Sequence, residues 1–157
     1  MTRTRGWVAV AVALISGAPL LAHHSLANHE TTKPVRIKGT VVQVHVINPH
    51  SFIYLEQRGE DGQIRRWAVE GPSVLQLNRS GRQNTLPKAG DVIEVCGYLP
   101  KERTTWQVAS PDPGAVSLAG RLINAEALVT ADGQERSWGD YGVHRCFAPG
   151  FKDQHSR

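Results

Sequence analysis

The strongest pattern in the chain is an alternation of β-branched and polar residues over positions 35–47, which predicts a long β-strand. Apolar positions before Gly39 fall on one face of this strand, and those after it fall on the other. The first group is Val35 and Ile37, and the second is Val42, Val44 and Val46. We therefore expect a bulge or sharp bend at Gly39. A long, bent first strand suits a small barrel, in which one strand serves both sides.

Asn48-Pro49-His50 interrupts the alternation and ends this strand. Four more strands are expected, at residues 51–57, 63–69, 91–99 and 121–130, with the first two joined by a turn at 59–62. Ser73 is placed to cap a short helix that runs to about Arg79. Five strands with one short helix between the third and fourth predict an all-β, OB-like five-stranded barrel. A small β-sandwich is the alternative, and a doubly wound fold would need crossover helices that the pattern lacks.

The N-terminal residues have the three parts of a secretory signal peptide, predicted over residues 1–22. Arg3 and Arg5 form its basic start, residues 7–21 are largely apolar, and Ala22 suits the cleavage site. A retained anchor is the alternative, but the apolar stretch is shorter than the roughly 20 residues that span a bilayer. We therefore expect a periplasmic or secreted protein with no transmembrane segment after cleavage.

The mature chain divides into three expected parts. Residues 23–33 are polar and without period, which predicts a flexible histidine-rich arm. Residues 34–133 form the predicted barrel, and residues 134–157 a C-terminal tail. Cleavage removes two of the positive charges behind the net charge of +4, and the remaining basic residues form no long run. This distribution argues against nucleic acid as a partner.

Cys96 and Cys146 are the only cysteines. Export would place them where disulfides persist, and one bridge between them would tether the tail to the barrel. Closing a loop of about 50 residues contributes about 4 kcal/mol in the chain-entropy description. Thiolate metal ligands or a redox pair are the alternatives, but there is no Cys-x-x-Cys motif.

Several short motifs resemble an uncharacterised family of small exported bacterial proteins. They are His23-His24-Ser25, Lys38-Gly39-Thr40-Val41, Asn48-Pro49-His50, Trp67-Ala68-Val69-Glu70-Gly71, Gly90-Asp91 and Gly97-Tyr98. The resemblance covers roughly residues 22–133 and implies a signal peptide and a compact β-barrel, with no established activity. Two strands are also similar, more distantly, to periplasmic OB-fold stress proteins. Where such proteins often carry an aromatic and an acid after the paired histidines, this chain has Leu26-Ala27-Asn28-His29-Glu30.

Histidines give the best chemical lead, because three of the seven, His23, His24 and His29, stand near the predicted mature start. Cleavage after Ala22 would give His23 a free α-amine, and this amine and its own imidazole can chelate one metal ion. A further imidazole would complete a nitrogen-rich set that suits Cu(II). His50 lies in a predicted loop that an extended arm of about ten residues, at roughly 3.3 Å each, can reach. We predict His23, His24 and His50 as ligands and copper as the first candidate; the alternative is ordinary surface histidines.

Enzyme motifs are lacking, including G-x-S-x-G, H-E-x-x-H and phosphate loops, so we expect no catalytic activity. Glu70 ends an apolar strand, and we expect it to anchor a loop rather than act as an acid or base. The competing function is a non-catalytic barrel that binds a protein, peptide or glycan. Its binding surface would comprise Tyr54, Trp67 and Trp106, for which core packing is the alternative.

Overall fold

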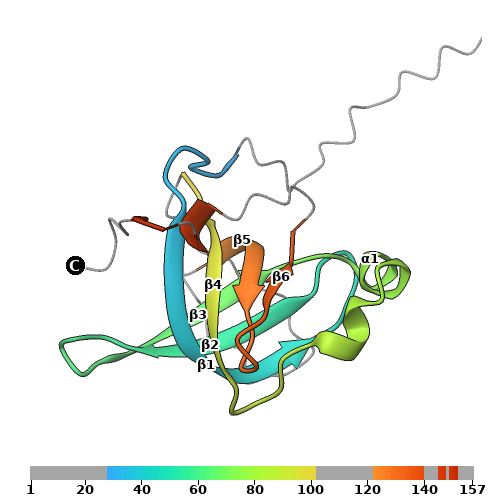
Figure 1. Ribbon diagram of the computed structural model, residues 1–157, viewed down its shortest axis with the longest axis horizontal. Helices are drawn as coiled ribbons and strands as arrows, with labels where there is room; N and C mark the ends of the chain where they lie inside the picture. The colour runs from blue at the N-terminus through green and yellow to red at the C-terminus, as the bar shows by residue number, and fades with distance from the viewer. Residues whose placement is uncertain (1–27, 102–121, 140–144, 148, 152–157) are drawn as a thin grey trace, which may run out of the picture.

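The computed structural model describes residues 28–101, 122–139, 145–147 and 149–151 (Figure 1). Its strands are β1 (Val35–His45), β2 (Phe52–Arg58), β3 (Ile64–Glu70), β4 (Val92–Tyr98), β5 (Leu122–Val129) and β6 (Glu135–Ser137). Its helical segments are the α-helix α1 (Val74–Arg79) and the 3-10 turns η2 (Arg82–Thr85) and η3 (Arg145–Phe147). All five predicted strands and the helix are confirmed, with small differences at their ends. Within these ranges no helix is both long and apolar enough to cross a membrane.

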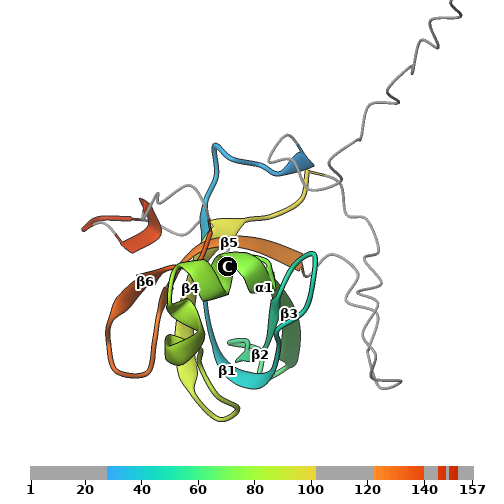
Figure 2. The same ribbon diagram turned by 90° about the vertical axis from the view of Figure 1, so that its right-hand side faces the viewer.

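The strands close into a small barrel. Neighbouring strands pair in the order β3-β2-β1-β4-β5-β6, and β3 also pairs with β5 in parallel. This last pairing joins Ala68 to Leu122 and Glu70 to Asn124, and it closes the ring. Figure 2 shows α1 lying across one end of the barrel. The all-β class and the short helix between β3 and β4 are therefore confirmed, and the closer likeness to an OB-type barrel remains a prediction.

β1 is irregular, as predicted, but not at the predicted residue. Its pairing with β2 shifts register between Val41 and Gln43, which leaves Val42 as the extra residue, 45% exposed. Gly39 has another role, because a Cβ there would lie 2.9 Å from the carbonyl oxygen of Glu56. The missing side chain lets β1 and β2 approach closely, whereas the phase change itself is absorbed at Val42.

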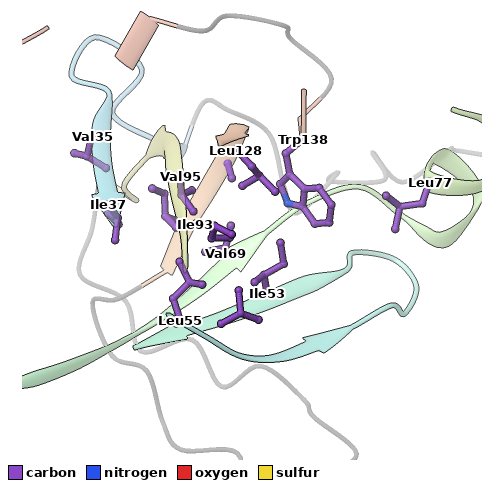
Figure 3. Close-up of a cluster of buried hydrophobic side chains, with 13 residues drawn as sticks. Val35, Ile37, Ile53, Leu55, Val69, Leu77, Ile93, Val95, Leu128 and Trp138 are labelled. Carbon is purple, nitrogen blue, oxygen red and sulfur yellow. The ribbon is translucent and has the colours of Figure 1, made fainter. Parts of the chain in front are cut away.

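Aliphatic side chains from β1 to β5 fill the interior, and α1 closes one end of it with Leu77, its one buried residue. Trp138 packs into the same core, on the side toward Leu77 (Figure 3). The sequence did not predict this role. The barrel was expected to end at Gly133, yet β6 and Trp138 extend its packing beyond that point. A strand as short as β6 shows no periodicity of its own, which is why the pattern missed it.

The predicted disulfide is confirmed. Cys96 and Cys146 are bonded, with Cα atoms 5.5 Å apart, and both are buried. They pack with Ala127 against Phe147 on the outer side of β4 and β5, and the Arg36 guanidinium lies 5.3 Å from the Phe147 ring centre. The bridge thus holds η3 against the barrel wall.

Residues 28–33 differ from the flexible arm expected over 23–33. His29 is 4% exposed and forms an isolated β-bridge with Pro100. Backbone hydrogen bonds join Glu30 to Leu99 and Lys101 to Asn28, each 2.9 Å long. The chain therefore reaches β1 from a fixed point at the end of β4, because backbone pairing overrides a local sequence without period.

Candidate functional site

The Asn-Pro-His loop after β1 is tied to the start of α1. The Oδ1 atom of Asn48 accepts a hydrogen bond of 3.2 Å from the backbone N–H of Val74. Ser73 caps the same helix, and its capping box is completed by Gln76. The bond between Asn48 and Pro49 is cis. The loop and the helix start thus support each other through groups that would otherwise lack partners.

Backbone hydrogen bonds continue from the β2–β3 hairpin into this loop. Ser51 donates to the carbonyl of Pro72, and Gly71 donates to that of Ser51, each at 2.9 Å. A Cβ on Gly71 would lie 2.0 Å from Nε1 of Trp138, so only glycine fits under the buried indole. The glycine of the Trp-Ala-Val-Glu-Gly motif therefore permits the close packing that positions the loop.

One ring nitrogen of His50 lies close to both a backbone carbonyl and a carboxylate. Its Nδ1 lies 3.3 Å from the carbonyl oxygen of Gly71 and 3.4 Å from Oε1 of Glu70. The Glu70 side chain is 1% exposed, whereas that of His50 is 27% exposed. A carbonyl oxygen only accepts, so Nδ1 carries the proton in the neutral ring and Nε2 carries the lone pair. This arrangement is the usual one for a histidine that binds metal through its other nitrogen.

Glu70 lies in the middle of a row of paired residues on the outer face of the barrel. It pairs with Phe52 on one side and Asn124 on the other. Asn124 also pairs with Tyr98 at the end of β4. Adjacent strands lie about 4.8 Å apart, so the end of β4 is about 10 Å from Glu70 across the sheet. Residues 28–30 are fixed beyond Tyr98, at residues 99–101. Because β5 is parallel to β3 and antiparallel to β4, this point lies along the strands in the direction away from Gly71.

The same outer face carries an aromatic group from β1 and β2. The rings of His45 and Tyr54 meet edge to face at 5.3 Å, and Tyr54 stacks with Phe52 at 6.3 Å. Nδ1 of His45 and Oη of Tyr54 are shielded from solvent and have no hydrogen-bond partner in the described part of the chain. Burial raises the pKa of the Tyr54 hydroxyl above its usual value near 10.

The sequence-predicted site residues fall into three groups. His50 lies at the contact just described, while His23, His24 and Trp106 lie outside the described residues. Tyr54 is on the outer face, but Trp67 packs against the core and donates to Oε1 of Gln57 at 2.9 Å. Tyr54 and Trp67 therefore do not form one platform. Among the described residues, no three His, Cys, Asp or Glu side chains come together to hold a metal.

Sequence reasoning missed three residues that shape this region. Asn48 caps α1, His29 is buried beside Pro100, and Trp138 covers Gly71. All three depend on contacts between distant segments, since even Asn48 lies 26 residues before Val74. A single sequence carries no signal for such contacts.

The fold and the loop define a small β-barrel protein with a histidine–carboxylate pair near one end. The chain belongs to the family of unknown function DUF6152, whose pattern matches residues 11–110. This match confirms membership of an uncharacterised family and includes the paired histidines, the Asn-Pro-His loop and Gly71. Cys146 and Trp138 lie beyond it. No curated protein matches the chain.

Proposed function

We propose that the chain is an exported, non-catalytic metal-binding module in which the mature N-terminus and His50 hold Cu(II). The observation that carries this proposal is the orientation of His50. Its Nδ1 lies 3.3 Å from the Gly71 carbonyl and 3.4 Å from a buried carboxylate, so Nε2 is the ligand atom in the proposed site.

Chain length makes the remaining ligands available. The segment is fixed at His29, and the five residues back to His24 span up to about 17 Å when extended. Tyr98 lies about 10 Å from Glu70 across the sheet, and His29 pairs with Pro100, two residues beyond Tyr98. The proposal requires the paired histidines and the α-amine of His23 to span this distance and the offset along the strands to the exposed edge of His50.

The donor set favours copper over other divalent ions. An α-amine and imidazoles are neutral nitrogen ligands, and a tetragonal nitrogen set suits Cu(II), which is also the tightest binder among divalent first-row metals. The α-amine must be free to take part, so signal-peptide cleavage next to His23 is part of the proposal. Mass spectrometry of the exported protein would report that start directly.

Copper titration of two forms tests the proposal. One form begins at His23, and the other carries one extra residue before it. We expect the first to bind Cu(II) more than about tenfold more tightly, and His50→Ala to weaken it comparably. His155→Ala is the matched control, because it removes a histidine outside the proposed set. Equal affinity of both forms, or no effect of His50→Ala, would refute the proposal.

A second candidate function is recognition of a peptide or glycan at the aromatic group of β1 and β2. It is favoured by the rings of His45, Phe52 and Tyr54, which group together, and by the Tyr54 hydroxyl, which has no hydrogen-bond partner in the described part of the chain. Removing an unpaired hydroxyl costs the free protein nothing, whereas it would weaken a ligand that uses it. Tyr54→Phe should therefore leave thermal stability unchanged or raised, and should reduce retention on peptide or glycan arrays if this candidate is right.

A further inference from the structure

Two buried polar atoms lie beside Gly71 on the inner side of the barrel. They are Oγ of Ser51, a residue that is 0% exposed, and Nε1 of Trp138, a residue that is 3% exposed. Neither atom has a hydrogen-bond partner in the described part of the chain. An unpaired polar atom inside a protein costs free energy, and most buried polar atoms bond to protein or to ordered water. We propose that Ser51 and Trp138 together bind one buried water molecule, which joins the loop after β1 to the chain that follows β6.

Strand register puts the two side chains on the same side of the sheet. Ile53 pairs with Val69, and both side chains belong to the core (Figure 3). Two residues away from this pair, Ser51 lies opposite Gly71, and the backbone N–H of Gly71 donates to the Ser51 carbonyl at 2.9 Å. Because side chains alternate between the two faces of a strand, Ser51 also faces inward, as does the hydrogen that replaces a side chain on Gly71.

The distance between the two polar atoms suits a bridge. A Cβ on Gly71 would lie 2.0 Å from Nε1 of Trp138. The Cβ atoms of opposite residues lie about 5 Å apart, so Nε1 lies within about 7 Å of the Cβ of Ser51. The Cβ–Oγ bond and two hydrogen bonds of about 2.9 Å through one water together cover this distance.

Water also fits the chemistry of the pair. The indole N–H only donates a hydrogen bond, whereas the serine hydroxyl can both donate and accept. The bound molecule must therefore accept from Trp138, which excludes a cation, and it can donate to Ser51. A neutral molecule that accepts and donates meets both needs, and two polar partners are enough to hold a buried water. This site needs no metal and does not depend on the proposed copper binding.

A crystal structure of the chain that begins at His23 tests the site directly, at a resolution that shows ordered water. We expect one water oxygen within about 3.2 Å of both Oγ of Ser51 and Nε1 of Trp138. A direct hydrogen bond between the two atoms, an ion in place of the water, or no density between them would overturn the proposal.

Chemical denaturation of variants gives a second test. Ser51→Ala should raise the equilibrium constant for unfolding about fivefold, because the water loses a partner, whereas removal of a hydroxyl without one would leave this constant unchanged or lower it. Ser137→Ala is the matched control, because it removes an exposed hydroxyl next to Trp138 and should change the constant less than about twofold.

A double-mutant cycle then asks whether the two side chains act together. In the Trp138→Phe background, which lacks the indole N–H, Ser51→Ala should change the unfolding constant less than about twofold. An unchanged constant for Ser51→Ala in the unmodified chain, or the same effect in both backgrounds, would overturn the bridge. If Trp138→Phe fails to fold, the crystal structure of the unmodified chain decides the question.

Discussion

Two regions of the barrel are fixed in different ways. At the α1 end, the loop at 48–51 is held by backbone hydrogen bonds to Gly71 and Pro72, by the Asn48 cap and by the close fit of Trp138. On the outer side of β4, η3 is held by one covalent bond between Cys96 and Cys146. The first region depends on geometry at every contact, and the second depends on a single link.

The contacts at the α1 end hold a loop in a defined conformation, whereas the disulfide keeps η3 attached to the barrel. The loop that these several short contacts hold is the one that carries His50. Substitutions at the α1 end should therefore change the local conformation of the loop as well as stability, whereas loss of the bridge should change stability alone.

The largest expected effect comes from removing the bridge. Cys96→Ala with Cys146→Ala should lower the free energy of unfolding by about 4 kcal/mol, because the unfolded chain gains the freedom of an open loop. Chemical denaturation measures this loss. In native buffer the tautomer of His50 should not change, and a change would show that the two regions are coupled rather than independent.

Gly71→Ala should cost about 2 kcal/mol, because its Cβ would lie 2.0 Å from Nε1 of the buried Trp138. Tryptophan fluorescence during denaturation reports both the stability and the displaced indole. Gly59→Ala is the control. A Cβ there meets the end of the Arg65 side chain, which can move aside, so stability should change little. Equal effects at both glycines would contradict the close fit described for the loop.

Asn48→Ala should cost about 1 kcal/mol, because the Val74 N–H loses its acceptor at the start of α1. Hydrogen exchange of the Val74 amide should become faster. Asn78→Ala, at an exposed position of the same helix, serves as control. Unchanged exchange at Val74 would mean that Asn48 does not hold the loop to the helix.

The smallest effect concerns the β5–β6 turn, which leads to Trp138. Hydrogen bonds from the Thr130 hydroxyl, the Gln134 backbone and Arg136 lower the pKa of Asp132 to about 2 from 3.8. A lowered pKa stabilises the fold above the unfolded value, and the gain is lost as pH falls toward 2. Asp132→Asn should therefore be slightly less stable than the unmodified chain at neutral pH, and the difference should vanish near pH 2 in denaturation curves.

Much of the fold followed from local patterns. Alternation located five strands, Ser73 located the helix start, and two cysteines gave one possible pair. The bulge was expected at Gly39 but lies at Val42, because a glycine can mark close strand approach as well as a bend. β6 was missed, and residues 28–33 were expected to be flexible, since both depend on pairing with distant strands.

The candidate site was only partly predictable. His50 was singled out from its place after Pro49, and Glu70 from its place at a strand end. Their contact could not be derived, because it depends on how the β2–β3 register brings the two ends of the hairpin together. Trp67 was considered both as a core or rim aromatic and as part of a binding surface, and the same register turns it toward the core.

The sequence alone determined which residues could alternate, cap, cross-link or bind metal, because these properties belong to each residue and its near neighbours. The tertiary structure decided which of them meet. Barrel closure sets Glu70 beside His50, Trp138 over Gly71 and His29 at the end of β4. Such meetings depend on strand register and chain path, which no local pattern specifies.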